Sequence, residues 1–176
     1  MIIRQAGDSD RDAIARLHIE SWRATYRGTL GDDYLDRDIY AERAAAWEQR
    51  FLAPPAGQYI AVAEIDGALA GFICAYGADD ARWGTLIDNV HVVEGHKRSG
   101  IGAALMMHAA QWCARAYPAH GIYLWVQERN AAAQRFYERL GGANAEDDTW
   151  EQPDGGTSRK FRYVWSNPGA LTLQDA

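Results

Sequence analysis

The chain has 176 residues, with 18 basic and 24 acidic side chains and a formal net charge of −6. This length is typical of one domain that buries its own core without metals or disulfides, and the acidic balance argues against bulk nucleic-acid binding, which needs a basic face. Hydrophobic residues make up 48% of the chain and include seven Trp, which excludes a disordered protein.

Neither an export signal nor a membrane span is predicted. The first ten residues, MIIRQAGDSD, lack a basic segment followed by an apolar one, and no run of 18 apolar residues occurs. The protein is therefore expected in the cytoplasm, without a membrane partner. Cys74 and Cys113 lack metal-ligand spacing, so we expect two buried thiols and no metal site.

The first third of the chain predicts one strand and two helices. Residues 2–6 are typical of a short strand, and Asp8 or Ser9 is placed to cap the helix that follows. A second helix is predicted over about 38–51 and ends before a pair of prolines. Its inward stripe is expected to contain Tyr40, Ala44, Trp47 and Phe51.

The middle of the chain predicts a hairpin, a third strand and a helix. Residues 58–77 contain two apolar runs separated by Asp66-Gly67, the pair favoured in a two-residue hairpin turn. Residues 85–93 are typical of a third strand of the same sheet. Apolar residues then recur at helical spacing over 100–116.

The last third predicts a strand, a helix and a second hairpin. Residues 121–127 are expected to form the strand. Asn130 is placed to cap a helix that extends to Leu140, and Gly141 suits a left-handed C-terminal cap. Two further strands flank the turn EQPDGG. The element order β-α-α-β-β-β-α-β-α-β-β predicts a mixed α/β sheet with helices packed on it.

The segment VHVVEGHKRSGIGAAL, residues 90–105, joins the third strand to a helix through a glycine turn. A P-loop needs Lys and then Ser or Thr after its last glycine, but Gly102 is followed by two alanines. A dinucleotide fingerprint needs a third glycine where this chain has Leu105. The sequence excludes both kinds of phosphate site.

A helix N-terminus that an anion can approach remains. Its first N–H groups are unpaired, its dipole places roughly +0.5 charge there, and Lys97 and Arg98 add full charges. This combination suits a pyrophosphate. A tight turn with solvated basic residues is the alternative.

The segment LWVQERNAAAQRFYERLGG, residues 124–142, contains a second pattern. Asn130 and Tyr137 are seven residues apart, which is two helical turns or roughly 10 Å along nearly the same helix face. Taken singly, Asn130 is also explained as a plain helix cap and Tyr137 as a core aromatic residue.

Together the two segments resemble motifs A and B of the GNAT superfamily, the acyl-CoA-dependent N-acyltransferases. The first stands where that family has V-x-P-x-x-(Arg/Gln)-G-x-G-x-(Gly/Ala), and RFYERLGG is similar to its Y-E-x-x-G-F ending. IIRQAGDSDRDAIARLH resembles the family's opening strand and helix, and LHIESWRATYRG resembles a bacterial subgroup of acetyltransferases. The resemblance implies a single domain over residues 1–166 with a mostly antiparallel sheet of about seven strands and about four helices. Residues 167–176 are expected to form a C-terminal tail.

The resemblance also implies a coenzyme A site. Lys97 takes the Arg/Gln position, and the amides that cradle the pyrophosphate belong to Arg98, Ser99, Gly100, Ile101, Gly102 and Ala103. Backbone hydrogen bonds to the pantetheine arm come from the segment Val90, His91 and Val92. Asn130 contacts the same arm, and Tyr137 lies near the sulfur.

Three positions depart from the family pattern. Glu94 replaces the common Pro and Arg98 the common Gly, which changes the electrostatics of the turn. Gly142 replaces an aromatic residue, which is expected to thin the packing beside Tyr137. None of these changes removes Gly100 or Gly102.

The sequence offers one candidate for the acid of an acetyl transfer and several for the base. Tyr137 is the candidate acid for the leaving thiolate, and a backbone N–H near Val92 is expected to bind the oxyanion. Members of the family often have Glu where this chain has Leu86. Asp88 shares a strand face with Leu86 by alternation and is the first candidate base, with a solvated or hydrogen-bonded strand-end residue as the alternative interpretation. His91 has the opposite parity unless a bulge resets it, and a water chain is a further alternative.

The acceptor is expected to be a primary amine, most simply that of a small molecule. Its site is expected in the first two helices and the loop between them, the part of the fold that varies with substrate. Trp22, Tyr26 and Tyr34 are candidate pocket walls, and the candidate cation-binding carboxylates are Glu20, Asp32 and Asp33. Core packing and a solvated acidic loop are the alternatives for these residues. The sequence therefore predicts an N-acetyltransferase that uses acetyl-CoA, with a peptide N-acetyltransferase or a non-catalytic acyl-CoA-binding domain as alternatives. A homodimer is compatible with it.

Overall fold

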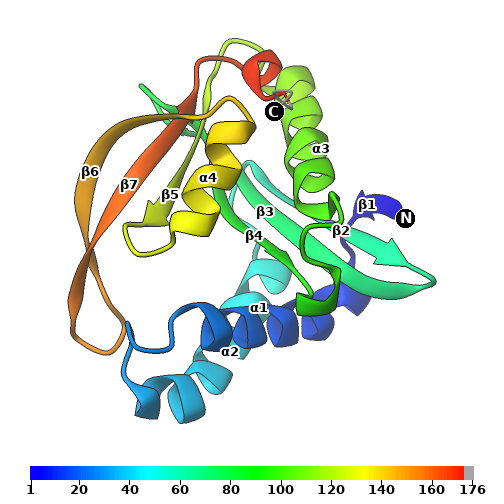
Figure 1. The fold of residues 1–176 in the computed structure, drawn as a ribbon. Helices are drawn as coiled ribbons and strands as arrows, with labels where there is room; N and C mark the ends of the chain where they lie inside the picture. Colours follow the sequence, from blue (N-terminus) through cyan, green and yellow to red (C-terminus); the bar gives the residue numbers. More distant parts are fainter. Residues whose placement is uncertain (173–176) are drawn as a thin grey trace.

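The computed structural model describes residues 1–172 and has the predicted order of strands and helices (Figure 1). The strands are β1 (Ile2–Gln5), β2 (Gln58–Ile65), β3 (Ala68–Asp80), β4 (Gly84–Val92), β5 (Ile122–Gln127), β6 (Ala143–Glu151) and β7 (Thr157–Trp165). The helices are α1 (Arg11–Thr25), α2 (Ile39–Leu52), α3 (Ile101–Ala116) and α4 (Ala131–Arg139). They confirm the expected mixed α/β class.

One sheet contains all seven strands in the order β1-β2-β3-β4-β5-β7-β6. Every neighbouring pair is antiparallel except β4 and β5, which are parallel. The β2–β3 turn has positive φ at both Asp66 (51°) and Gly67 (77°), as the predicted hairpin requires.

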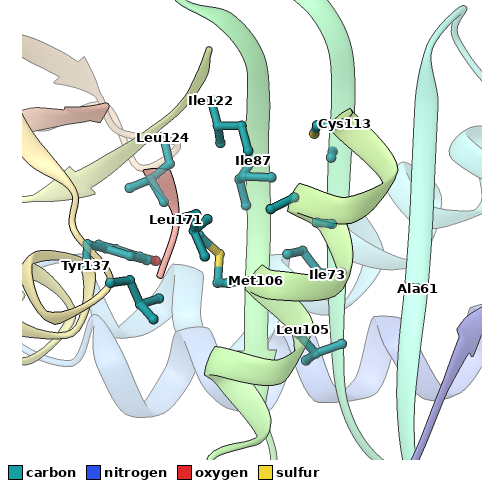
Figure 2. Close-up of a cluster of buried hydrophobic side chains, with 14 of the residues drawn as sticks. Ala61, Ile73, Ile87, Leu105, Met106, Cys113, Ile122, Leu124, Tyr137 and Leu171 are labelled. Atoms are coloured by element: carbon teal, nitrogen blue, oxygen red, sulfur yellow. The ribbon is translucent and has the colours of Figure 1, made fainter. Parts of the chain in front are cut away.

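The helices cover the two faces of the sheet. In Figure 1, α1 and α2 lie on one side and α3 and α4 on the other. Ile14, Trp47 and Phe72 belong to the core between α1, α2 and the sheet. The larger core lies under α3 and α4, and Figure 2 shows Leu105, Met106 and Tyr137 within it. Cys74 and Cys113 are fully buried free thiols, as expected.

Helix ends differ in how well the sequence predicts them. The side chain of Asn130 accepts a hydrogen bond from the N–H of Ala133 (3.1 Å), and Gly141 is left-handed (φ +82°), so both predicted caps of α4 are confirmed. The predicted cap of α1 is wrong. A short 3₁₀ turn over Asp8–Asp10 moves the helix start to Arg11, and the carboxylate of Asp10 instead accepts from the N–H of Gly7 (2.8 Å).

The structure differs from the sequence-based expectation in two other places. Tyr40 was expected to face inward on α2, but it is 44% exposed, and its ring lies under the guanidinium of Arg23 (5.6 Å) on the outer surface. In the segment expected to be a tail, Pro168–Ala170 forms a 3₁₀ turn against α3 and Leu171 is buried. Residues 173–176 of that segment lie outside the described residues.

Candidate active site

The turn between β4 and α3 presents free backbone N–H groups. Gly100 is the N-cap residue and is left-handed (φ +87°). The first hydrogen bond of the helix joins the N–H of Ala104 to the carbonyl of Gly100 (3.0 Å). Within residues 1–172, no partner occupies the N–H groups that precede it, those of Ile101, Gly102 and Ala103. These groups and the helix dipole are available to an anion.

Gly102 keeps the space beside these amides open. A β-carbon at this position would lie 3.3 Å from the ring of Phe136 on α4 and 3.7 Å from Val92 on β4. A larger side chain would therefore enter the narrow space where α3, α4 and β4 meet.

The two basic residues of the turn differ: Lys97 forms an ion pair, and Arg98 has a left-handed backbone. The ammonium of Lys97 pairs with the carboxylate of Glu94 (2.6 Å), the residue that replaces the common Pro. Arg98 is left-handed (φ +64°), a conformation that costs a non-glycine residue about 1–2 kcal/mol. This explains why glycine is the common residue at this position. The hydroxyl of Ser99 donates to the carbonyl of His96 (2.6 Å), inside the turn itself.

Strands β4 and β5 diverge beside the turn (Figure 1). They pair only at Thr85–Ile122 and Leu86–Tyr123. The N–H of Val93 bonds to the carbonyl of Ala70 on the β3 side (2.9 Å), so by alternation the backbone of Val92 points toward the gap. The gap thus offers unpaired strand groups to an extended chain.

A cleft of about 830 Å³ follows this gap from the α3 N-terminus to α1. It collects most of the predicted site residues: Trp22, Tyr26, Asp88, Val90, His91, Val92, Lys97, Arg98, Gly100, Gly102, Ala103, Asn130 and Tyr137. Ser99 and Ile101 do not line it. The side chain of Ile101 is in the core (2% exposed), so only its amide faces the turn.

Tyr137 projects from α4 toward α3 (Figure 2). Its burial, with a smaller effect of nearby Tyr26, raises the pKa of the phenol well above its usual range. The phenol therefore stays protonated at neutral pH. The packing beside it is not thin, which corrects the expectation for Gly142: a β-carbon there would lie 2.7 Å from the indole of Trp165, which already packs against Tyr137.

Asp88 sits in a β-bulge of β4. Cys74 pairs with Asn89 and Ala75 with Ile87, so Asp88 is the extra residue. Its carboxylate accepts from the guanidinium of Arg50 on α2 (2.7 Å) and from the side chain of Asn89. The candidate base is thus already engaged.

The bulge also resets the parity of β4. His91 pairs with Phe72 and faces the same side as Asp88. Its Nδ1 lies 2.7 Å from the hydroxyl of Ser21 on α1, and its ring centroid lies 4.7 Å from that of His18. Burial, with Lys97 as a smaller cause, lowers the pKa of His91 to about 4. The imidazole is therefore neutral at neutral pH.

The acceptor side of the cleft is walled by α1. Trp22 and Tyr26 line it as predicted, together with Ser21 and Thr25 on the same helix face. Sequence reasoning missed Ser21 and Thr25, although SWRATY places them at helical spacing with the two aromatic residues. It also missed residues that other elements contribute to the lining: Asn89, His96, Trp125, Gln127, Arg135, Phe136 and Arg139.

Four predicted acceptor residues do not reach the cleft. The phenol of Tyr34 donates to Glu42 in a separate small core. Asp32 pairs with Arg27 (2.8 Å) and Asp33 with Arg37 (3.7 Å) at the surface. Glu20 is exposed. The structure supports the alternative reading of these residues as core and solvated loop.

The β6–β7 hairpin contacts α1 and the loop after it on this side. The carboxylate of Asp154 accepts from the N–H of Gly31 in the loop after α1 (2.6 Å). The ring of Trp150 packs against those of Trp22 (6.0 Å) and Tyr26 (5.7 Å). The loop and the hairpin are therefore joined above the acceptor side.

Within residues 1–172, no helix is both long and apolar enough to cross a membrane. The same residues contain no group of three or more His, Cys, Asp or Glu side chains arranged to hold a metal ion.

Comparisons with known proteins agree with this geometry. The model of the Acetyltransferase (GNAT) family matches residues 13–142. The chain is 28% identical over 155 residues to the uncharacterized N-acetyltransferase YuaI of Bacillus subtilis, covering 85% of this chain and 84% of that protein. Two solved structures share the fold. PaiA N-acetyltransferase of Thermoplasma acidophilum, in complex with coenzyme A, has a TM-score of 0.71 at 16% identity and covers 94% of this chain and 98% of its own. YncA of Salmonella typhimurium, with acetyl-CoA, has a TM-score of 0.68 at 21% identity over 100% and 96% of the two chains.

Proposed function

This chain belongs to the acetyltransferase (GNAT) family, and from that premise we propose that it moves an acetyl group from acetyl-CoA to a primary amine of a small molecule. The observation that carries the proposal is that one cleft of about 830 Å³ joins the free amides of α3, the gap between β4 and β5, and the phenol of Tyr137.

The residues present fit coenzyme A. The N–H groups of Ile101, Gly102 and Ala103 suit a pyrophosphate, since they combine unpaired donors with the positive end of the helix. Lys97 and Arg98 add charge at the same place. The open backbone of β4 and the side-chain NH₂ of Asn130, which has no partner within residues 1–172, suit the amide groups of a pantetheine arm.

Groups in the cleft can stabilise the oxyanion and protonate the leaving sulfur. Bound acetyl-CoA supplies an acetyl group that is already activated as a thioester. The N–H of Val92 points into the gap and is placed to stabilise an oxyanion. Tyr137 holds its proton at neutral pH and donates it to the departing sulfur.

The closed acceptor side favours a small molecule over a peptide. The contacts of Gly31 with Asp154, and of Trp22 with Trp150, join the β6–β7 hairpin to α1 and to the loop after it on the acceptor side. A small amine needs only the space between α1 and β4.

The test is coenzyme A release from acetyl-CoA with a panel of small primary amines and, in parallel, peptides with free N-termini or lysines. Turnover confined to small amines is expected. Turnover confined to peptides would refute the acceptor class, and tight acetyl-CoA binding without turnover of any acceptor would indicate a binding domain.

A further inference from the structure

Two candidate proton acceptors, the side chains of Asp88 and His91, face the acceptor side of the cleft, and their surroundings differ. The carboxylate of Asp88 accepts from Arg50 and Asn89. A proton taken up there would disrupt an ion pair whose guanidinium is largely buried and already has an unpartnered nitrogen, Nη1. Asp88 is therefore held as a structural anion.

His91 is held as an oriented neutral imidazole. If Nδ1 donates to the hydroxyl of Ser21, Nε2 carries the lone pair. Within residues 1–172, Nε2 of His91 has no hydrogen-bond partner, and it lacks the complete burial of Nε2 of His18. His91 lines the cleft, and Nε2 rather than Nδ1 is the ring nitrogen left for a bound amine.

His18 supports the ring from behind. It is fully buried, and its Nδ1 accepts from the indole of Trp47 (3.0 Å), which fixes the proton of the neutral ring on Nε2. Burial, then His91, Arg43 and Arg50, lowers the pKa of His18 well below its usual range. A neutral ring at 4.7 Å leaves His91 free to become charged for the duration of one turnover.

We propose that His91, oriented by Ser21, is the catalytic base that accepts the proton of the acceptor amine, and that the Asp88–Arg50 pair is a positioning element of the bulge. This rests on the proposed function. Nε2 of His91 takes one proton from the acceptor ammonium and passes it to solvent, which leaves a neutral amine. As the bond from nitrogen to the acetyl carbon then forms and the bond from that carbon to sulfur breaks, Tyr137 gives its proton to the sulfur and regains one from solvent, and the nitrogen loses its second proton to solvent. Two protons thus leave the nitrogen and one ends on the sulfur, so one net proton is released for each ammonium consumed.

The charged groups around His91 set the direction of its pH dependence. They are Lys97 in the turn before α3, Arg50 and Arg43 on α2 near His18, and Asp88 on its own strand. Burial and, to a smaller extent, Lys97 favour the neutral ring of His91, so the base is in its active form through neutral pH and is lost only as the pH falls toward the lowered pKa of His91.

The test compares three variants of the full chain, using the best small amine of the panel. His91→Asn keeps a donor to Ser21 at the place of Nδ1 and removes Nε2. It is expected to lower kcat about 100-fold or more at pH 7, with unchanged coenzyme A affinity. Asp88→Asn keeps the shape of the carboxylate and is expected to lower kcat less than about tenfold. Ser21→Ala, which frees the ring, is expected to fall between the two.

A pH series separates catalysis from structure. The loss in His91→Asn should shrink as the pH rises, because more of the amine arrives neutral and needs no base; a merely structural loss would not change with pH. A large loss in Asp88→Asn with an active His91→Asn, or equal and pH-independent losses in both, would overturn the assignment of His91. If the wild-type protein acetylates no amine, the proposed function itself fails, which is a distinguishable result.

Discussion

The two ends of the cleft are formed by different kinds of chemical group. At the proposed coenzyme end, the groups are backbone amides and a gap between strands, placed by one continuous segment from Val90 to Ala103. At the proposed acceptor end, they are side chains that α1, α2 and β4 bring together from distant parts of the chain, beside the β6–β7 hairpin. A backbone site tolerates side-chain changes that leave its turn intact, whereas a side-chain site depends on each contributor. The two ends should therefore respond separately to mutation.

Gly102→Asp is the largest expected change and affects the coenzyme end alone. Its β-carbon would meet Phe136 at 3.3 Å, and its carboxylate would stand beside the pyrophosphate position. We expect coenzyme A affinity to fall about 100-fold or more, roughly 3 kcal/mol, measured by calorimetry. Gly95→Asp is the matched control, because a β-carbon there has no neighbour within 4 Å. Equal effects of the two variants would contradict the pyrophosphate assignment.

Tyr137→Phe tests the junction of the two ends. The variant keeps the ring that packs on Trp165 and removes only the proton donor. We expect kcat to fall about 100-fold while coenzyme A affinity changes little. Because burial raises the pKa of Tyr137, the wild-type rate should not decline as the pH rises through the usual range of tyrosine. An unchanged kcat would remove Tyr137 from the mechanism.

Sequence reasoning predicted the local backbone geometry of the proposed coenzyme end because that geometry depends on residues close together in the chain. A helix cap at Asn130, positive φ at Gly100 and free amides after it all follow from short patterns. It failed where packing between distant elements decides. The bulge at Asp88 places His91 on the acceptor face, and the pairing of Asp88 with Arg50 depends on how α2 lies on the sheet. No spacing within either segment encodes such a contact.

Asp154→Ala affects the acceptor end alone. It removes the hydrogen bond from Gly31 that joins the β6–β7 hairpin to the loop after α1. We expect the KM for the amine to rise about fivefold, since a single exposed contact is lost, with coenzyme A affinity unchanged. The hydrogen bond from the N–H of Gly31 also lowers the pKa of Asp154. The contact between hairpin and loop is therefore stabilising above the usual pKa range of Asp, and this stabilisation is lost as the pH falls through the lowered pKa of Asp154. A shift in coenzyme A affinity instead would show that the two ends are coupled.

Arg98→Gly separates charge from backbone strain at the coenzyme end. Glycine accepts φ +64° without cost, so the free energy of unfolding should rise by about 1 kcal/mol in a urea titration. Coenzyme A affinity should fall severalfold at low salt through the lost charge. Arg98→Ala is the control, because it removes the charge and keeps the strain. Equal stabilities of the two variants would show that the turn is not strained.

Glu94→Gln should have the smallest effect and the opposite sign, because Glu94 competes with the coenzyme for Lys97. The carboxylate lies 2.6 Å from the ammonium, and both side chains are exposed, so the pair is weak and screened by salt. Removing the charge frees Lys97 for the pyrophosphate, and we expect coenzyme A to bind about two- to threefold more tightly, with a gain that disappears at high ionic strength. Glu20→Gln on α1 makes the same change in net charge away from the turn and should have no effect. Weaker binding of coenzyme A to Glu94→Gln would mean that the ion pair positions Lys97 for the pyrophosphate rather than withholding it.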